Sequence, residues 1–256
     1  MKVVFLGTGT STGVPMIGCN CEVCTSQDLR NKRKRASIYI RTDNAHVVVD
    51  TPPDFRVQAL EYKIERVDAL LYTHSHADHI FGFDDVRRFN TIQQCVIPAY
   101  GSPSTISDLK RIFNYVGNQK ISGVFRPQIE FHEISGPFEI GDLSVTPLEV
   151  KHELKHTYGY RFSANNCSLG YVPDCREMPQ TTLDAFKGVD VMILDALRYR
   201  PHSTHLSIPE SLELLQKIGA RKSYLIHMCH DIEHSKVEKE LPEGVYLSYD
   251  GLTLEW

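Results

Sequence analysis

Short apolar runs, broken by glycine, aspartate or histidine, recur along most of the chain and predict a protein rich in β-strands. Each run has the length of a strand and is too short for a typical helix. The early runs predict strands at Lys2–Leu6, Ala36–Arg41, His46–Asp50 and Ala69–Thr73. The later runs predict strands at Gln128–Ile134, Leu143–Glu149, Tyr158–Ser163, Ser168–Tyr171, Val191–Asp195, Ser223–Ile226, Val245–Ser248 and Leu252–Glu255.

Other segments carry the apolar spacing of helices. These predicted helices are Phe55–Tyr62, Phe83–Thr91, Ile106–Tyr115, Thr181–Phe186 and Pro209–Ile218. Ser207 precedes the last of them, where its hydroxyl group can cap the free backbone N–H groups. Strands come first as hairpin-like sets and then alternate with helices, so the pattern favours an α+β fold in which helices cover two packed sheets.

Composition narrows the class of protein. The 256 residues contain no obvious linker or low-complexity stretch, which predicts a single domain over residues 1–256. A hydrophobic content of 41% with 23% charged residues is typical of a soluble globular protein, and no apolar run is long enough to span a membrane. The start, MKVVFLGTGTSTG, is too short for a signal-peptide core and cleavage site, so we expect a cytoplasmic enzyme.

The charge pattern gives no overall basic field. A net charge of -4 does not favour binding to a nucleic-acid backbone, so we do not expect nucleic acid as a partner. The run RNKRKR at residues 30–35 is the local exception. It is either a solvated loop or a patch that faces phosphate.

The densest chemistry lies at residues 74–79, which read HSHADH directly after an apolar run. Two histidines one residue apart point to different sides of a regular helix, and the motif lies between the end of a predicted strand and the start of a helix, so a loop is expected to carry them. Such a loop can direct His74 and His76 to one cation while Asp78 and His79 reach a second. Imidazole with carboxylate suits zinc, manganese, iron or nickel rather than calcium or magnesium.

Three later residues occupy similar places along the chain. His152, Asp174 and His227 each follow a predicted strand. Taken singly, they could be a surface histidine, a turn aspartate and a core histidine. Together they complete a ligand set in which one carboxylate can bridge two cations.

This ordered set resembles the metallo-β-lactamase superfamily over nearly the whole chain. The resemblance implies an αββα sandwich that binds two divalent ions, zinc or manganese, and a hydroxide on those ions that attacks the substrate. It assigns the first ion to His74, His76 and His152, the second to Asp78, His79 and His227, and the bridge to Asp174. It also implies that Asp50 orients a metal ligand, although an ordinary turn aspartate fits that position equally well.

Further stretches narrow the resemblance. LGTGTSTGVP at 6–15, VVVDTPPDFRVQAL at 47–60, STHLSI at 203–208 and LIHMCH at 225–230 are similar to the branch that contains the phosphonate-pathway phosphoribosyl cyclic phosphodiesterase. That branch implies hydrolysis of a small, possibly cyclic, phosphodiester, and it suggests a homodimer. The glycine-rich GTGTSTG lacks the Gly-Lys-Ser/Thr ending of a nucleotide P-loop, so we expect a tight turn whose backbone approaches the metals.

Three of the seven cysteines are clustered as Cys19, Cys21 and Cys24. An odd, clustered set of thiols in a reducing compartment favours metal over disulfides. In the branch named above, such a trio binds a structural zinc with a histidine three residues after the last catalytic ligand, which here is His230. The resemblance therefore implies a closed Cys3His site on a loop at about residues 16–30.

Departure of an alkoxide from a phosphodiester requires a proton donor. The resemblance suggests His205, in STHLSI, as this general acid, although a histidine packed at the start of a helix fits the same position. We place Asp78 and His205 together as the catalytic residues. The segment Ser102–Phe125 is expected to shape the substrate mouth.

Three other functions stay open at this level. A tRNA 3'-end endonuclease shares the histidine motif, but the chain has no long basic insertion suited to a tRNA. A thioester or lactone hydrolase would use the same activated water on carbon. A non-catalytic scaffold would use the metals only for stability.

Overall fold

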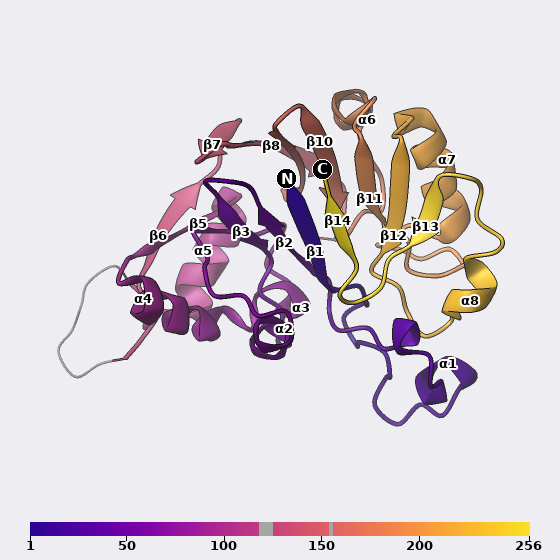
Figure 1. The fold of residues 1–256 in the computed structure, drawn as a ribbon, viewed down its shortest axis with the longest axis horizontal. Helices are drawn as coiled ribbons and strands as arrows, with labels where there is room; N and C mark the ends of the chain where they lie inside the picture. Colours follow the sequence, from indigo (N-terminus) through magenta and orange to yellow (C-terminus); the bar gives the residue numbers. More distant parts are fainter. Residues whose placement is uncertain (118–124, 154–155) are drawn as a thin grey trace.

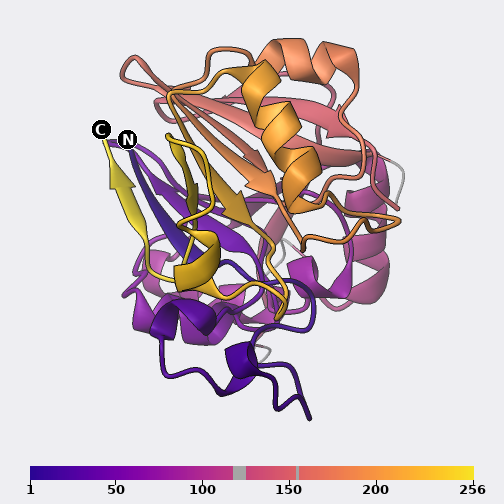
Figure 2. The same ribbon diagram turned by 90° about the vertical axis from the view of Figure 1, so that its right-hand side faces the viewer.

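Two β-sheets pack face to face, and helices cover the outer face of each sheet (Figure 1). The computed structural model describes residues 1–117, 125–153 and 156–256. Figure 2, turned by 90°, shows helices on both outer faces again. This is the α+β sandwich that the alternation of strand and helix patterns predicts.

The first sheet combines antiparallel and parallel pairing. Its seven strands, in spatial order, are β14 (Thr253–Glu255), β1 (Lys2–Gly7), β2 (Ser37–Arg41), β3 (His46–Val49), β4 (Ala69–Leu71), β5 (Ile97–Gly101) and β6 (Ile129–Glu133). Strands β14 to β3 pair antiparallel, whereas β3 to β6 pair parallel. The parallel half therefore directs the carboxyl ends of β3 and β4 to the same edge.

The second sheet repeats this arrangement. Its seven strands, in spatial order, are β13 (Val245–Leu247), β12 (Lys222–Ile226), β11 (Val191–Asp195), β10 (Cys167–Val172), β9 (Thr157–Ala164), β8 (Leu143–Val150) and β7 (Phe138–Ile140). Strands β10 to β13 are parallel, and β7 to β10 are antiparallel. The carboxyl ends of β10, β11 and β12 consequently lie side by side.

The helices divide between the two outer faces. The first sheet is covered by α2 (Phe55–Glu61), the 3-10 helix η2 (Phe83–Val86), α4 (Arg87–Gln93) and α5 (Pro103–Ile112). The second is covered by α6 (Gln180–Phe186), α7 (Ile208–Ile218) and α8 (His234–Val237). The short elements α1 (Glu22–Thr25) and η1 (Leu29–Asn31) lie in a loop that projects from the sandwich, and α3 (Ala77–Ile80) follows β4.

The core explains the strand pattern. Ile38 and Ile40 alternate along β2 and are fully buried against residues of the second sheet such as Phe162 and Ile193. Side chains on the other face of each sheet pack under its helices, as Leu70 does in the first sheet and Leu225 in the second. Burial of these apolar surfaces at about 25 cal/mol per Å² is the main force that holds the layers together.

Most predicted elements are present, and the exceptions have identifiable causes. The predicted helix Ile106–Tyr115 begins earlier, at Pro103, because the Ser102 hydroxyl accepts from the backbone N–H of Thr105, and it ends at Ile112. The predicted helix Phe83–Thr91 is two elements, η2 and α4. Strand β5 was not predicted because Pro98 within it argues against a strand. No helix in the described ranges is long and apolar enough to cross a membrane.

Candidate metal centre

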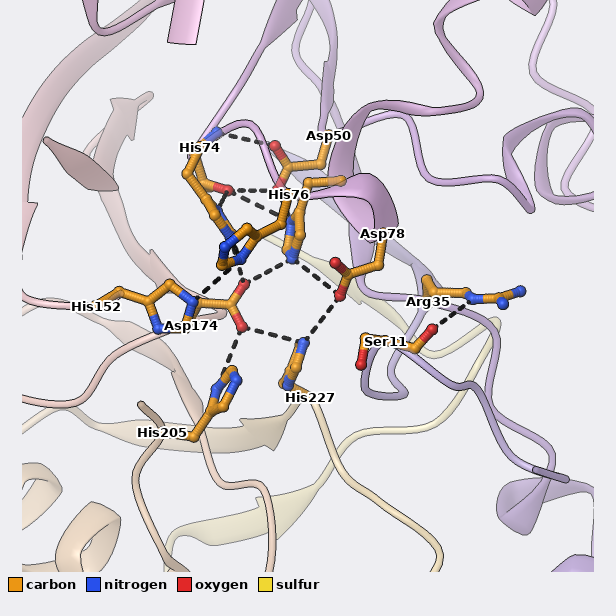
Figure 3. A network of polar contacts seen from close by, with 12 residues as sticks. Ser11, Arg35, Asp50, His74, His76, Asp78, His152, Asp174, His205 and His227 are labelled. Atoms are coloured by element: carbon orange, nitrogen blue, oxygen red, sulfur yellow. Dashed lines mark hydrogen bonds and ion pairs between the residues drawn. The ribbon is translucent and has the colours of Figure 1, made fainter. Parts of the chain in front are cut away.

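The histidines and aspartates predicted to bind metal meet at one edge of the sandwich, where strands of both sheets end (Figure 3). Strand β4 leads to the HSHADH motif, β8 to His152, β10 to Asp174 and β12 to His227. The site exists because parallel strands of the two packed sheets end in the same place. Segments far apart in the sequence thereby supply ligands to one point.

The first group of ligand atoms belongs to His74, His76 and His152. Nε2 of His74 lies 2.9 Å from Nδ1 of His76, and Nε2 of His152 lies 3.4 Å from the same atom. His74 and His76 are on the loop after β4, as predicted. Three imidazole nitrogens that converge this closely fit a divalent transition metal.

The second group consists of Asp78, His79 and His227. An Asp78 carboxylate oxygen lies 3.5 Å from Nε2 of both His79 and His227. Asp78 and His79 are both on the short helix α3, which begins directly after the loop that carries the two preceding histidines. One helical turn separates their side chains from those of the preceding histidines and directs them to the second group.

Asp174 lies between the two groups. Its Oδ2 is 2.7 Å from Nε2 of His79 and 3.7 Å from Nε2 of His74, and its Oδ1 is 3.0 Å from Nε2 of His227. Figure 3 shows its carboxylate at the centre of these contacts. Both oxygens are buried, and neither has a hydrogen bond of good geometry within the described residues. Such lone pairs are what a cation requires, so the buried carboxylate fits the predicted bridging position.

Neighbouring polar groups fix the orientation of the histidine ligands. Asp50, directly after β3, accepts from Nδ1 of His79 at 2.8 Å and is held by the backbone N–H and hydroxyl of Thr73. Nδ1 of His152 donates to the Thr204 carbonyl at 2.7 Å. The donated proton leaves Nε2 of both rings free for a metal. Asp50 therefore has the geometry of the orienting role that the resemblance implies.

Burial and neighbouring charges shift the pKa values of the ligand residues in different directions. Burial opposes the charged form of His74, and its neighbour His79 opposes it further, so the pKa of His74 is well below its ordinary value. Burial alone would raise the pKa of Asp174, but His227 and His79 hold it well below its usual range. The same balance lowers the pKa of Asp78. His74 is therefore ready to bind a cation without first releasing a proton. Burial lowers the pKa of His79, but the surrounding carboxylates outweigh burial and raise it well above its ordinary value, so this ring must release a proton when a metal binds.

His205 is held by a carboxylate that the sequence did not identify. Its Nδ1 donates to Oδ2 of Asp195 at 3.0 Å and lies 3.4 Å from Oδ1 of Asp174. Burial lowers the pKa of His205, but Asp195 and Asp174 outweigh burial and raise it to about 9. The ring is therefore protonated at neutral pH, as a general acid requires. Asp195 is the last residue of the apolar strand β11. In the sequence, nothing distinguishes it from an aspartate that simply ends a strand.

A cavity of about 370 Å³ is lined by six of the predicted site residues, namely His76, Asp78, His152, Asp174, His205 and His227. Its wall also includes five residues that the site prediction did not contain, namely Ser11, Ala77, Glu153, His202 and Thr204. Ser11 belongs to the glycine-rich turn, which agrees with the expectation that this backbone approaches the site. Gly7 and Gly9 have a different reason to be glycine, because a Cβ on either would clash with the backbone of residues 33–35.

The cysteine trio, in and just before α1, meets His230 from the turn after β12, as predicted. Nδ1 of His230 lies 3.2 Å from Sγ of Cys19 and 3.4 Å from Sγ of Cys21. The backbone N–H of Cys24 donates to Sγ of Cys21 and is the main cause that lowers the pKa of this thiol to about 6. Three sulfur donors and one imidazole around one point match a tetrahedral zinc site.

Much of the basic run at residues 30–35 contacts other parts of the fold. Arg33 is buried and donates to the carbonyls of Cys229 and Ile232, which flank His230. Arg35 forms an ion pair with Asp54 and donates to the Ser11 carbonyl. The run therefore joins the cysteine loop and the glycine-rich turn to the rest of the fold.

The expected substrate mouth, Ser102–Phe125, is described only in part, because residues 118–124 lie outside the described residues. Its first part, α5, contacts the metal motif through Ser75, whose hydroxyl donates to Asp108 at 2.7 Å. Among the described residues of this segment, Asp108 included, none lines the cavity.

Comparison with known proteins agrees with this geometry. The family described as the beta-lactamase superfamily domain matches residues 45–228, which contain every predicted ligand of the active site. The chain belongs to the metallo-β-lactamase superfamily. Its two sheets and outer helices are the αββα sandwich of this superfamily, and the fold implies divalent metals at the strand-end site.

The similar proteins within this superfamily are named for different activities. A solved diphosphatase of the PhnP family has a TM-score of 0.91 and 38% identity, with 100% of this chain and 97% of that chain covered. An octanoyltransferase from Porphyromonas gingivalis is 33% identical over 98% of this chain, which spans 51% of that relative's length. The zinc-bound PqqB of Methylobacterium extorquens, at 20% identity and a TM-score of 0.83 with full coverage of both chains, shows the shared fold alone.

Proposed function

We propose that this hydrolase cleaves a small phosphodiester with two divalent metal ions. The observation that carries the proposal is the position of Asp174 between two ligand groups, in a cavity that the proton donor His205 also lines. Two adjacent cations and a proton donor are the components that phosphoryl transfer to water requires. The similarity to a PhnP-family diphosphatase supports the same class of chemistry.

Different residues of the chain would bind the metals and donate the proton. When bound, two divalent ions supply Lewis acidity, which activates water at neutral pH and offsets negative charge on the phosphoryl oxygens. His74, His76 and His152 would hold one ion, Asp78, His79 and His227 the other, and Asp174 both. His205 gives a proton from Nε2 to the leaving oxygen, while Asp195 holds its Nδ1 and keeps the ring oriented.

The lining of the cavity favours phosphoryl over acyl substrates. Among the described residues that line it, Ala77 is the only one with a purely apolar side chain. A long acyl group would need an apolar wall to offset its ordering on binding. The name of the octanoyltransferase relative therefore does not lead us to propose acyl transfer for this chain, which spans only about half of that relative.

A diphosphate bond is the second candidate substrate. The diphosphatase relative is 38% identical over the whole chain, and this similarity is the observation that favours a diphosphate substrate. Hydrolysis of a P–O–P linkage uses the same ligand set, but its leaving group is a phosphate oxygen of lower basicity than an alkoxide. The proton from His205 should therefore matter less for a diphosphate than for an alkyl phosphodiester.

The experiment combines metal analysis with substrate profiling. Metal content per chain is measured for the protein as purified, and turnover is measured on cyclic and linear phosphodiesters, a diphosphate diester, a thioester, a lactone and a tRNA precursor. We expect about three metal ions per chain and turnover confined to the small phosphoryl substrates. Turnover confined to the carbon esters or the tRNA would replace the proposed substrate class, and full metal occupancy without any turnover would indicate a scaffold.

A further inference from the structure

His202 lines the active-site cavity, yet it is in neither of the two ligand groups described above for the active site. It is in the turn after β11, three residues before His205, and its ring centroid lies 5.3 Å from that of His205. It therefore stands on the wall beside the proton donor. The sequence analysis assigned no role to this histidine.

The backbone fixes which nitrogen of His202 carries the proton. The backbone N–H of Thr204 points at Nδ1 over 3.3 Å, and the Thr204 hydroxyl lies 3.1 Å from the same atom. A backbone N–H can only donate, so Nδ1 must be the acceptor and the neutral ring carries its proton on Nε2. Burial and the neighbouring His205 also lower the pKa of His202, which favours the neutral ring. Within residues 1–117, 125–153 and 156–256, no hydrogen bond engages Nε2.

The same turn is tied to the metal site. The carbonyl of Thr204 accepts from Nδ1 of His152, and the N–H of Thr204 holds His202. One peptide segment thus sets the direction of a predicted metal ligand and of a hydrogen-bond donor on the cavity wall. Because this donor is already fixed, little conformational entropy of its side chain is lost when a ligand binds.

We infer that His202 is a substrate-binding residue whose Nε2–H donates to a phosphoryl oxygen of the substrate. This inference rests on the proposed function for the class of substrate. A tetrahedral phosphoryl group offers more oxygens than the reacting centre engages, and each remaining oxygen is a strong acceptor. A neutral imidazole can donate to one of them without competing for the cations.

Inorganic phosphate is the probe that tests this role without turnover. Its dissociation constant is measured by calorimetry on the metal-loaded wild type and on His202→Ala, with metal content determined for both. Loss of one neutral hydrogen bond should weaken phosphate binding about tenfold, and metal content should not change. His202→Gln, which keeps an N–H donor, should recover most of the affinity. His132→Ala, on the distant strand β6, serves as the matched histidine control and should bind phosphate like the wild type.

Other outcomes would overturn the inference. Equal phosphate affinity in His202→Ala and the wild type would remove His202 from ligand binding, as would a wild type that binds no phosphate. Loss of metal from His202→Ala would make it a metal ligand instead. Long-range ¹H–¹⁵N spectra of the zinc-loaded protein add a separate readout, because a proton on Nδ1 of His202 would contradict the tautomer on which the inference depends.

The two proposals can fail independently. If the wild type hydrolyses phosphodiesters and His202→Ala shows an unchanged KM, the function stands and the role of His202 is wrong. If the wild type hydrolyses only carbon esters, the proposed function fails, and the phosphate titration still decides whether His202 binds an oxyanion. A raised KM with a nearly constant kcat in His202→Ala supports a binding role.

Discussion

At the scale of single residues, two members of the site adopt a backbone conformation that favours glycine. Asp50 has a φ of 65° and His227 a φ of 63°, each directly after a buried strand. For residues with a Cβ this left-handed conformation costs about 1 kcal/mol or more, and such residues persist where the surrounding structure holds them. Here the turn it produces directs Asp50 to His79 and His227 to Asp174. Local backbone strain is thus associated with ligand placement.

Asp174 lies between the two ligand groups. Asp174→Asn keeps the size of the side chain but removes its charge, so affinity for both ions should fall together by roughly 10- to 100-fold. Metal titration followed for each ion separately measures this. Loss of only one ion would show that Asp174 is not a bridge.

Asp195 sets the proton affinity of His205, which predicts a pH dependence. The pKa of His205 is raised to about 9, so the acid form is present below that pH and is lost as the pH rises through it. The rate on an alkyl phosphodiester should therefore fall on the alkaline side. In Asp195→Asn the alkaline limb should move to lower pH, because the carboxylate no longer stabilises the imidazolium ion. An unchanged profile in this variant would exclude His205 as the group that titrates.

At the scale of elements, the segments that follow the strands carry the candidate site residues, and helices support them from outside. Helix α5 contacts the HSHADH motif through Asp108, which accepts from the Ser75 hydroxyl between His74 and His76. Arg111, one turn further along, forms an ion pair with the same carboxylate. The helix therefore limits the movement of the loop that carries the first ligand group.

Asp108→Ala should lower turnover about 3- to 10-fold, because ligand geometry that is slightly loose costs rate more than stability. The melting temperature should change little, since Asp108 is partly exposed. Asp184→Ala on α6 removes a similar i,i+3 ion pair far from the site and is the matched control. Equal turnover in both variants would mean that the contact with Ser75 has no catalytic effect.

The sequence predicted more of the ligand set than of its supports. His74, Asp174 and their partners could be identified because ligand-type residues at strand ends form an ordered pattern. Asp195 and His202 could not, because an aspartate that ends an apolar strand and a histidine in a turn have no periodic signal. Their partners, such as Thr204 for His202 and His205 for Asp195, become apparent only once the turn after β11 has folded. The predicted start of α5 was wrong because a cap and Pro103 decide it. Strand β5, which contains Pro98, was not predicted at all.

At the scale of the whole molecule, the two sheets contribute different parts of one site. The first sheet supplies the HSHADH motif and Asp50, and the second supplies His152, Asp174, His205 and His227. The site is therefore complete only when the two sheets pack together. A single domain over residues 1–256 stays a prediction, as does the homodimer.

The cysteine cluster should affect stability more than chemistry. Cys21→Ser should release one zinc ion per chain and lower the melting temperature by roughly 5 °C or more. Turnover below that temperature should be largely retained. Cys95→Ser, at an exposed free cysteine, is the control. If turnover stops while the melting temperature is unchanged, the cluster belongs to the active site.

The Cys3His cluster also bears on the order of events during synthesis. Cys19 and His230 are 211 positions apart, and all the predicted active-site ligands lie between them. The thiols leave the ribosome early, whereas the imidazole follows only after β12 has been made. A zinc ion held by all four ligands can therefore be enclosed only late, and it then closes a loop that spans most of the chain. Capture of that ion would mark a molecule whose two sheets have already come together.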